Sequence, residues 1–156
     1  MKISEILTEE FITPHLKGSS KAEVIDAIVE LVSASDKVLD KEKVRDAILQ
    51  REKIMSTGVG SGFAIPHGKT EAVSDIVAAF GVTEKPIDYQ SLDEQPVRLV
   101  FLLVGKDSTV GPHIKLLSRI SRLMNKGEFR RKLLETKTAR EILETFRQEE
   151  ASYFDI

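Results

Sequence analysis

The most restrictive feature of this sequence is an uninterrupted apolar run, Leu99-Val100-Phe101-Leu102-Leu103-Val104, which ends at Gly105. A strand with one face in water alternates apolar and polar residues, whereas a strand that is covered on both faces is apolar throughout. A second short segment, from Ile76 to Val82, is also apolar and rich in β-forming residues. The rest of the chain must therefore supply cover for both faces of a sheet.

Amphipathic patterns predict helices before and after these strands. The capping box Ser20-Lys21-Ala22-Glu23 predicts a helix that begins near Lys21, and Asp40 is expected to cap a second one. Pro112 predicts a third helix, because proline is favoured in a first turn, and two shorter helices are expected around 128–135 and 138–148. The residues expected to face the core from the first three helices are Val24, Ile25, Ile28, Val29 and Val32, then Val44, Ala47 and Ile48, then Ile114, Leu117, Ile120, Leu123 and Met124.

Helices before, between and after buried strands are typical of a layered α/β sandwich. We therefore predict a single domain over residues 1–156, in which a mixed β-sheet carries helices on both faces. The chain has no cysteine, which excludes disulfides, thiol catalysis and Cys-ligated zinc. No apolar run approaches the roughly 20 residues of a membrane helix, and the first residues do not form a signal peptide. We expect a cytoplasmic protein without direct membrane insertion.

Basic residues are concentrated between positions 115 and 140, where nine lysines and arginines stand against two glutamates, in a chain whose net charge is −2. This basic stretch could be a solvated face, or it could meet an acidic protein or nucleic acid. Phe129 is its only aromatic residue, so bases would find little to stack on. We do not expect nucleic-acid binding.

The glycine-rich segment 56–70 contains two near-matches to nucleotide-binding motifs, and both fail on spacing. A phosphate-binding loop that ends in Gly68-Lys69-Thr70 needs glycine at position 63, as does a dinucleotide fingerprint that starts at Gly58. Position 63 is phenylalanine. The segment must instead bend sharply or let another group approach closely.

His67, held between Pro66 and Gly68, is the candidate for chemistry in this segment. A neutral imidazole can attack phosphorus without a separate base. Backbone N–H groups of the glycine-rich turn and a nearby guanidinium could stabilise the resulting anion. Arg51 follows Val44 by seven residues, so it continues the inward face of its helix and is expected to point to the interior or a cleft. The alternative is a turn histidine that only bonds to its own loop.

Three motifs together resemble the fructose/mannitol-type enzyme IIA family of the bacterial phosphotransferase system, which includes the nitrogen-regulatory IIA proteins. They are Arg51-Glu52, Ser56-Thr57-Gly58-Val59-Gly60 and Ala64-Ile65-Pro66-His67-Gly68-Lys69. The resemblance extends along nearly the whole chain. Phe63 departs from the pattern, where an aliphatic residue is expected, and this bears on packing more than on chemistry.

The resemblance implies that His67 accepts a phosphoryl group from the phosphocarrier protein HPr. The group then passes to a cysteine of a IIB protein or remains as a regulatory mark on a protein that acts on a target. Arg51 matches the arginine beside the phosphorylated histidine, and His113 matches a second histidine that supports the site. No cofactor and no metal are implied. Arg130 and Arg131 of the basic stretch could steer such partners.

Several alternatives stay open from the sequence. His113 lies in a first helical turn, which favours an anion, but it also shares a face with Leu117 and Ile120, as a buried core histidine would. His15 has no supporting context and is expected to be a surface residue. The chain carries no fused IIB segment, which favours a nitrogen-regulatory IIA over the IIA subunit of a sugar permease. A binding module that has lost phosphorylation is the third possibility.

Overall fold

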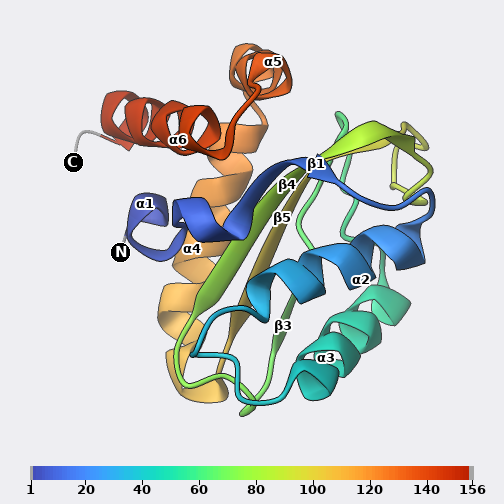
Figure 1. Ribbon diagram of the computed structural model, residues 1–156, viewed down its shortest axis with the longest axis vertical. Helices are drawn as coiled ribbons and strands as arrows, with labels where there is room; N and C mark the ends of the chain where they lie inside the picture. Colours follow the sequence, from blue (N-terminus) through green and yellow to red (C-terminus); the bar gives the residue numbers. More distant parts are fainter. Residues whose placement is uncertain (1, 155–156) are drawn as a thin grey trace.

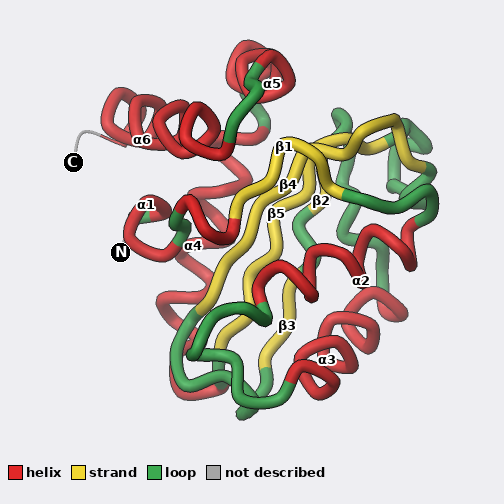
Figure 2. The backbone as a smooth tube through the Cα atoms, viewed as in Figure 1, coloured by secondary structure: helices red, strands yellow, loops and turns green. Residues whose placement is uncertain are grey.

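The computed structural model, which describes residues 2–154, has helices on both faces of a mixed β-sheet (Figures 1 and 2), and the predicted α/β sandwich is confirmed. The strands follow the order β1-β4-β5-β2, and β3 also pairs with β5. The β4–β5 pair is antiparallel, and the other pairs are parallel. The strands are β1 (Ile12–Leu16), β2 (Phe63–Ala64), β3 (His67–Lys69), β4 (Val77–Ile87) and β5 (Val97–Gly105).

Two helices, α2 (Lys21–Val32) and α3 (Lys41–Ile54), cover one face of the sheet (Figure 1). Both begin where the sequence predicts. The Ser20 hydroxyl accepts a hydrogen bond from the Glu23 N–H, and the Asp40 carboxylate accepts one from the Lys43 N–H, each at 3.3 Å. These caps satisfy backbone donors that the first turn leaves unpaired.

The other face is covered by α4 (Val110–Met124), together with α1 (Ile3–Ile6), α5 (Gly127–Glu135) and α6 (Ala139–Phe154). The short 3₁₀ helix η1 (Glu9–Phe11) precedes β1, and η2 (Asp107–Thr109) joins β5 to α4. The two predicted C-terminal helices are therefore present, and α6 extends six residues beyond the predicted end at position 148. No helix in the described part of the chain is long and apolar enough to cross a bilayer.

The central strand β5 explains the continuous apolar run. Leu99, Phe101 and Leu103 belong to the core cluster on the α4 side. The intervening residues Val100, Leu102 and Val104 belong to the cluster on the α2–α3 side. Successive side chains of a strand point to opposite faces, so a strand between two layers of helices is apolar at every position.

One predicted face is partly wrong. Ile114 of α4, expected in the core, is 60% exposed, and Leu117 is only half-buried. Leu116, which the pattern did not predict, is buried with Ile120 and Leu123. The core-facing stripe of α4 therefore begins at His113 and Leu116. Leu117 is half-buried but packs against the core as predicted, and only Ile114 lies away from it. Ala47 of α3 is half-buried rather than fully buried.

The N-terminal segment is attached to the C-terminal helix through the buried carboxylate of Glu150. This carboxylate accepts hydrogen bonds from the backbone N–H groups of Ile3, at 2.6 Å, and Ser4, at 3.2 Å. It also forms an ion pair with Arg119 of α4 at 3.3 Å. An anion that accepts N–H bonds at the start of a helix is electrostatically favoured, so Glu150 links α1, α4 and α6.

We predict that Phe146→Ala lowers the free energy of unfolding by about 3–5 kcal/mol, because a large buried ring is replaced by a cavity. The Phe146 ring lies edge-on to the rings of Phe80, Phe101 and Phe129, at centroid distances of 5.1, 5.7 and 5.2 Å. Urea unfolding followed by circular dichroism measures the change. The control Gln148→Ala replaces an exposed residue of the same helix and should stay within about 0.5 kcal/mol of the wild type. Equal effects in the two variants would contradict the assignment of this ring cluster as the core.

Candidate functional site

The fold brings His67, Arg51 and His113 to the wall of one cavity of about 720 Å³. Arg51 comes from the last turn of α3, His67 from the start of β3 and His113 from the first turn of α4. β3 pairs in parallel with the end of β5, with His67 opposite Leu103. The chain reaches α4 directly after the end of β5, through η2, so His113 arrives beside the same strand ends.

Gly68 allows β3 and α3 to approach closely. A Cβ atom at this position would lie 3.2 Å from the backbone carbonyl carbon and oxygen of Ala47. A larger residue would push the strand away from the helix, and with it His67 away from Arg51. The glycine that follows the histidine therefore sets the spacing of the site.

The ring of His67 is held in one orientation. Its Nδ1 lies 2.8 Å from the carbonyl oxygen of Ile65. A carbonyl oxygen can only accept a hydrogen bond, so Nδ1 carries the proton and Nε2 of the neutral ring keeps its lone pair. Burial lowers the pKa of His67 below its usual 6.5; the Ile65 carbonyl acts against this shift, and the nearby Arg51 charge adds to it. A neutral ring with a free Nε2 is the nucleophilic form.

His113 is buried, as a core histidine would be, and it also lines the cavity. Its side chain is 3% exposed, and its ring centroid lies 6.1 Å from that of His67. Burial lowers the pKa of His113 to about 4, and the neighbouring His67 and Lys69 contribute to the shift. Its Nδ1 has no hydrogen-bond partner within residues 2–154. A Cβ at Gly105 would lie 2.9 Å from this nitrogen, so the ring occupies space that a glycine leaves open.

Arg51 turns towards the cavity, as its position on the helical face predicts. Its Nη1 donates a hydrogen bond to the carbonyl oxygen of Met55 at 2.8 Å, which fixes the side chain across the end of α3. A guanidinium has five N–H donors, so this one bond leaves donors for an anion. Lys53 and Lys69 also line the cavity, against a single acidic residue, Asp107. The excess of positive charge favours an anionic ligand.

The glycine-rich turn does not serve the site in the way the sequence suggests. Gly68 lines the cavity, but Gly58, Gly60 and Gly62 do not. A Cβ at Gly58 would lie 2.5 Å from the Ser91 hydroxyl oxygen, and Gly60 and Gly62 have positive φ angles of 136° and 83°. These glycines form a tight turn against the segment around Ser91 and Asp93. The expected anion cradle of N–H groups from this turn is therefore not found at His67.

Sequence reasoning missed several residues of the cavity. Lys69 follows His67 by two residues in β3, and the period of a strand places such residues on the same side, so this signal was available. The exposed apolar residues Ile54, Val110 and Ile114 also line the cavity. Nothing in one sequence distinguishes them from ordinary core residues of their helices.

The other candidate residues lie elsewhere. His15 is an exposed residue of β1. α5, which carries Arg130 and Arg131, lies at the opposite end of α4 from the turn that holds His113 (Figure 1). Arg130 donates to the carbonyl oxygen of Met124, and Arg131 pairs with Glu128. Arg130 and Arg131 are thus not part of the cavity lining, and neither is any other basic residue of the stretch 115–140.

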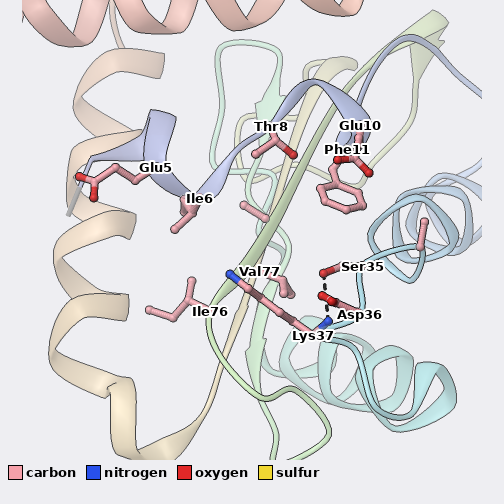
Figure 3. A pocket seen from close by; sticks show the side chains of 12 residues that line it. Glu5, Ile6, Thr8, Glu10, Phe11, Ser35, Asp36, Lys37, Ile76 and Val77 are labelled. Atoms are coloured by element: carbon pink, nitrogen blue, oxygen red, sulfur yellow. Dashed lines mark hydrogen bonds between the residues drawn. The ribbon is translucent and has the colours of Figure 1, made fainter.

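A second hollow, of about 460 Å³, lies between the N-terminal segment and residues 34–37 (Figure 3). Glu5, Glu10 and Asp36 surround it, and Lys37 is its single basic residue. It contains no histidine, and its net negative charge would repel a phosphoryl group. Within residues 2–154, no cluster of three metal-ligating side chains is found.

Comparison with known proteins matches residues 5–149 to the family described as "Phosphoenolpyruvate-dependent sugar phosphotransferase system, EIIA 2". The chain is 38% identical over 144 residues to a nitrogen regulatory protein of Bradyrhizobium diazoefficiens, covering 91% of this chain and 92% of that protein. It is also 38% identical over 148 residues to the fructose-specific EIIABC component of Bacillus subtilis. That match covers 95% of this chain but spans only 23% of the relative.

Solved structures show the same fold. Nitrogen regulatory protein IIA-Ntr from Neisseria meningitidis superposes with a TM-score of 0.87 at 29% identity, covering 92% of this chain and 98% of that one. Mannitol enzyme IIA from Escherichia coli, solved as a complex with phosphorylated enzyme IIB, superposes with a TM-score of 0.77 at 22% identity, covering 92% of this chain and 99% of that one. At that lower identity the likeness concerns the fold alone.

We predict that His113 stays neutral in the folded protein until about pH 4. The unfolded chain takes up this proton near pH 6.5, so it binds more protons than the folded chain between these values. Stability should therefore be complete above pH 6.5 and fall as the pH is lowered towards 4. Ring resonances followed by NMR against pH test the titration. Urea unfolding at about pH 7 and at about pH 4.5 measures the stability. The free energy of unfolding of His113→Gln should fall less between these two pH values than that of the wild type. A wild-type His113 that titrates near 6.5 would contradict this environment.

Proposed function

Because the chain belongs to the EIIA 2 family of the phosphoenolpyruvate-dependent sugar phosphotransferase system, we propose that it is a phosphohistidine carrier, phosphorylated by phospho-HPr on Nε2 of His67. The observation that carries the proposal is the fixed ring of His67. Its Nδ1–H is bonded to the Ile65 carbonyl oxygen, and the cavity around it is lined by an excess of cations. We propose that residues 1–156 form one enzyme IIA domain and that it acts in the cytoplasm.

The transfer step would be an in-line displacement at phosphorus. The Nε2 lone pair of His67 forms the new N–P bond, while the bond between phosphorus and the donor imidazole breaks and its electron pair returns to the donor nitrogen. The His67 ring becomes more positive as the bond forms. The Ile65 carbonyl, which accepts the Nδ1–H, stabilises this charge, so no proton has to leave during the step.

Arg51 and His113 would act on the phosphoryl group after it arrives. A guanidinium can pair with two phosphoryl oxygens through parallel N–H bonds. His113 contributes its place in the first turn of α4, where free backbone N–H groups and the positive end of the helix dipole favour an anion. Lys69 adds a further positive charge to the same cavity. The group is thus held by charge and position, as expected of a carrier that must release it again.

The rim of the cavity suggests how partners dock. Ile54, Val110 and Ile114 are exposed beside His67, and an apolar centre with charged neighbours is typical of a protein interface. We propose that HPr docks on this rim, followed by a IIB protein or a regulatory target. The solved complex of mannitol IIA with phosphorylated IIB supports a IIB partner for this fold. We propose neither nucleic-acid binding nor membrane insertion for this chain.

Within this family we favour a nitrogen-regulatory role. Support comes from relatives named nitrogen regulatory proteins that match this chain over most of their own length, and from the IIA-Ntr structure. The second candidate is the IIA subunit of a sugar permease, supported by the fructose-specific EIIA component of Haloferax volcanii, 34% identical over 88% of its length. Transfer of the phosphoryl group from this chain to the cysteine of a fructose-type IIB protein would favour the permease role. A module without phosphorylation is disfavoured, because Arg51, His67 and His113 share one cavity.

We predict that incubation with phosphoenolpyruvate, enzyme I and HPr adds one acid-labile phosphate to the wild type and none to His67→Ala. Both His67 and His113 line the cationic cavity, but His67 is only half-buried, whereas His113 is 3% exposed and out of reach of a phosphoryl donor. Intact-protein mass spectrometry measures this. His15→Ala is the matched control, since it removes an exposed histidine far from the cavity, and it should be phosphorylated as the wild type is. An unlabelled wild type, in a mixture that labels a known IIA, would contradict the proposed function.

We further predict that Arg51→Gln lowers the rate of phosphoryl acceptance by about ten- to a hundred-fold, because charge stabilisation of the transferring group is lost. Stopped reactions followed by mass spectrometry give the rate. Arg45→Gln changes a partly exposed arginine of the same helix that pairs with Asp26 and does not line the cavity. The rate of this variant should equal that of the wild type. Equal rates for Arg51→Gln and the wild type would contradict a role for Arg51 in phosphoryl acceptance.

A further inference from the structure

Glu52, the residue after Arg51, is a buried carboxylate that the proposed chemistry does not use. Its side chain is 5% exposed, yet donors from three separate parts of the chain bond to it. Thr57 donates its backbone N–H, at 3.2 Å, and its hydroxyl. The Tyr89 hydroxyl donates at 3.0 Å, and the Lys21 ammonium lies 2.9 Å away. A buried charge is tolerated only when it is paired and hydrogen-bonded in this way.

The partners of Glu52 are themselves held in place. Tyr89 is fully buried, and burial together with the Glu52 charge raises the pKa of its hydroxyl, so it remains a donor. The Lys21 ammonium lies 4.8 Å from the centre of the Tyr89 ring, a cation–π distance. Lys21 is the first residue of α2, and Tyr89 follows β4. Glu52 therefore ties the end of α3 to the start of α2 and to the connection between β4 and β5.

A chain of hydrogen bonds leads from Glu52 to the nucleophile. The carboxylate holds the Thr57 N–H. The carbonyl oxygen of the same Thr57 accepts the Ile65 N–H at 3.0 Å. The carbonyl oxygen of Ile65 accepts the His67 Nδ1–H at 2.8 Å. The glycine-rich turn lies between Thr57 and Ile65, so these bonds hold its two ends together at a fixed distance from Arg51.

From this geometry we propose that Glu52 is a positioning residue, which sets the orientation and the tautomer of His67 through Thr57 and Ile65. The proposal rests on the proposed function, since the tautomer matters because it leaves Nε2 free for phosphorus. Loss of the carboxylate would release the Thr57 N–H and leave Lys21 unpaired. The turn would shift, the Ile65 carbonyl would move with it, and the proton of His67 would no longer be confined to Nδ1. A displacement of about 1 Å at a reacting group is enough to slow a transfer about a hundred-fold.

Glu150 offers a matched control for this proposal. It is also a buried glutamate that accepts backbone N–H bonds and pairs with a basic residue, in its case Arg119. It links α6 to the N-terminal segment and is not part of the His67 cavity lining. Glu150→Gln and Glu52→Gln thus impose comparable structural losses, and they differ in whether the lost bonds lead to His67.

The experiment compares Glu52→Gln, Glu150→Gln and the wild type by long-range ¹H–¹⁵N NMR of the histidine rings, and by the rate of phosphorylation from phospho-HPr. We expect the wild type and Glu150→Gln to show a single tautomer of His67, protonated at Nδ1, and rates within about two-fold of each other. We expect Glu52→Gln to show a mixture of tautomers and a rate lower by about ten- to a hundred-fold. Tyr89→Phe removes one donor of Glu52 and keeps the buried ring, so it should shift the tautomer in the same direction, to a smaller extent. It serves as the test if Glu52→Gln does not fold.

A folded Glu52→Gln, or a folded Tyr89→Phe in its place, with the wild-type tautomer and rate would overturn the proposal. An equal loss in Glu150→Gln would also overturn it, because the effect would then be general instability. The NMR readout needs no phosphoryl donor. If the wild type is never phosphorylated but Glu52→Gln still changes the tautomer, the proposed function fails while the positioning role stands.

Discussion

Burial of β5 on both faces is the constraint on which the rest of the structure depends. A strand that is apolar at every position must lie inside its sheet, and helices must cover both of its sides. The alternation of Leu99, Phe101 and Leu103 with Val100, Leu102 and Val104 divides the core into two clusters. The same strand also locates the site. Its last residues pair with β3, which carries His67, and its end leads through η2 into α4, which carries His113.

The cavity combines two histidines that do not need to ionise with permanent positive charges. Burial lowers the pKa of both His67 and His113, which favours the neutral form of each ring and lets the two rings lie side by side without electrostatic repulsion. The permanent charges are placed around them, on Arg51, Lys53 and Lys69. Under the proposed function, these fixed donors would replace solvent around a phosphoryl group in the cavity.

Sequence patterns predicted the structure correctly where a feature depends on one helix or strand alone. The caps at Ser20 and Asp40, the inward turn of Arg51 and the covered strand at 99–104 follow from helix and strand periods, and all are found in the structure. The patterns failed where the position of a residue depends on how its helix or turn packs against a second element. Ile114 has the spacing of a core residue but lies beside the cavity, because α4 contacts the sheet through His113 and Leu116. The glycines at 58, 60 and 62 fit a phosphate cradle, yet Ser91 occupies the space beside Gly58 and Asp93 the space beside Gly60.

The sequence by itself determined the class of fold and the family, and it singled out Arg51, His67 and His113, which line one cavity. These features depend on hydrophobic period and on motifs within short segments. The tertiary structure alone decided how His113 meets His67, with ring centroids 6.1 Å apart, although 45 residues separate them in the chain. It also decided that Lys53 and Lys69 add charge to the cavity, that Arg130 and Arg131 lie away from it, and that Glu52 connects to His67 through Thr57 and Ile65. The physical reason is that charges and hydrogen bonds act over short distances in space. The distances between residues far apart in the sequence are set by strand register and helix packing, which exist only in the folded chain.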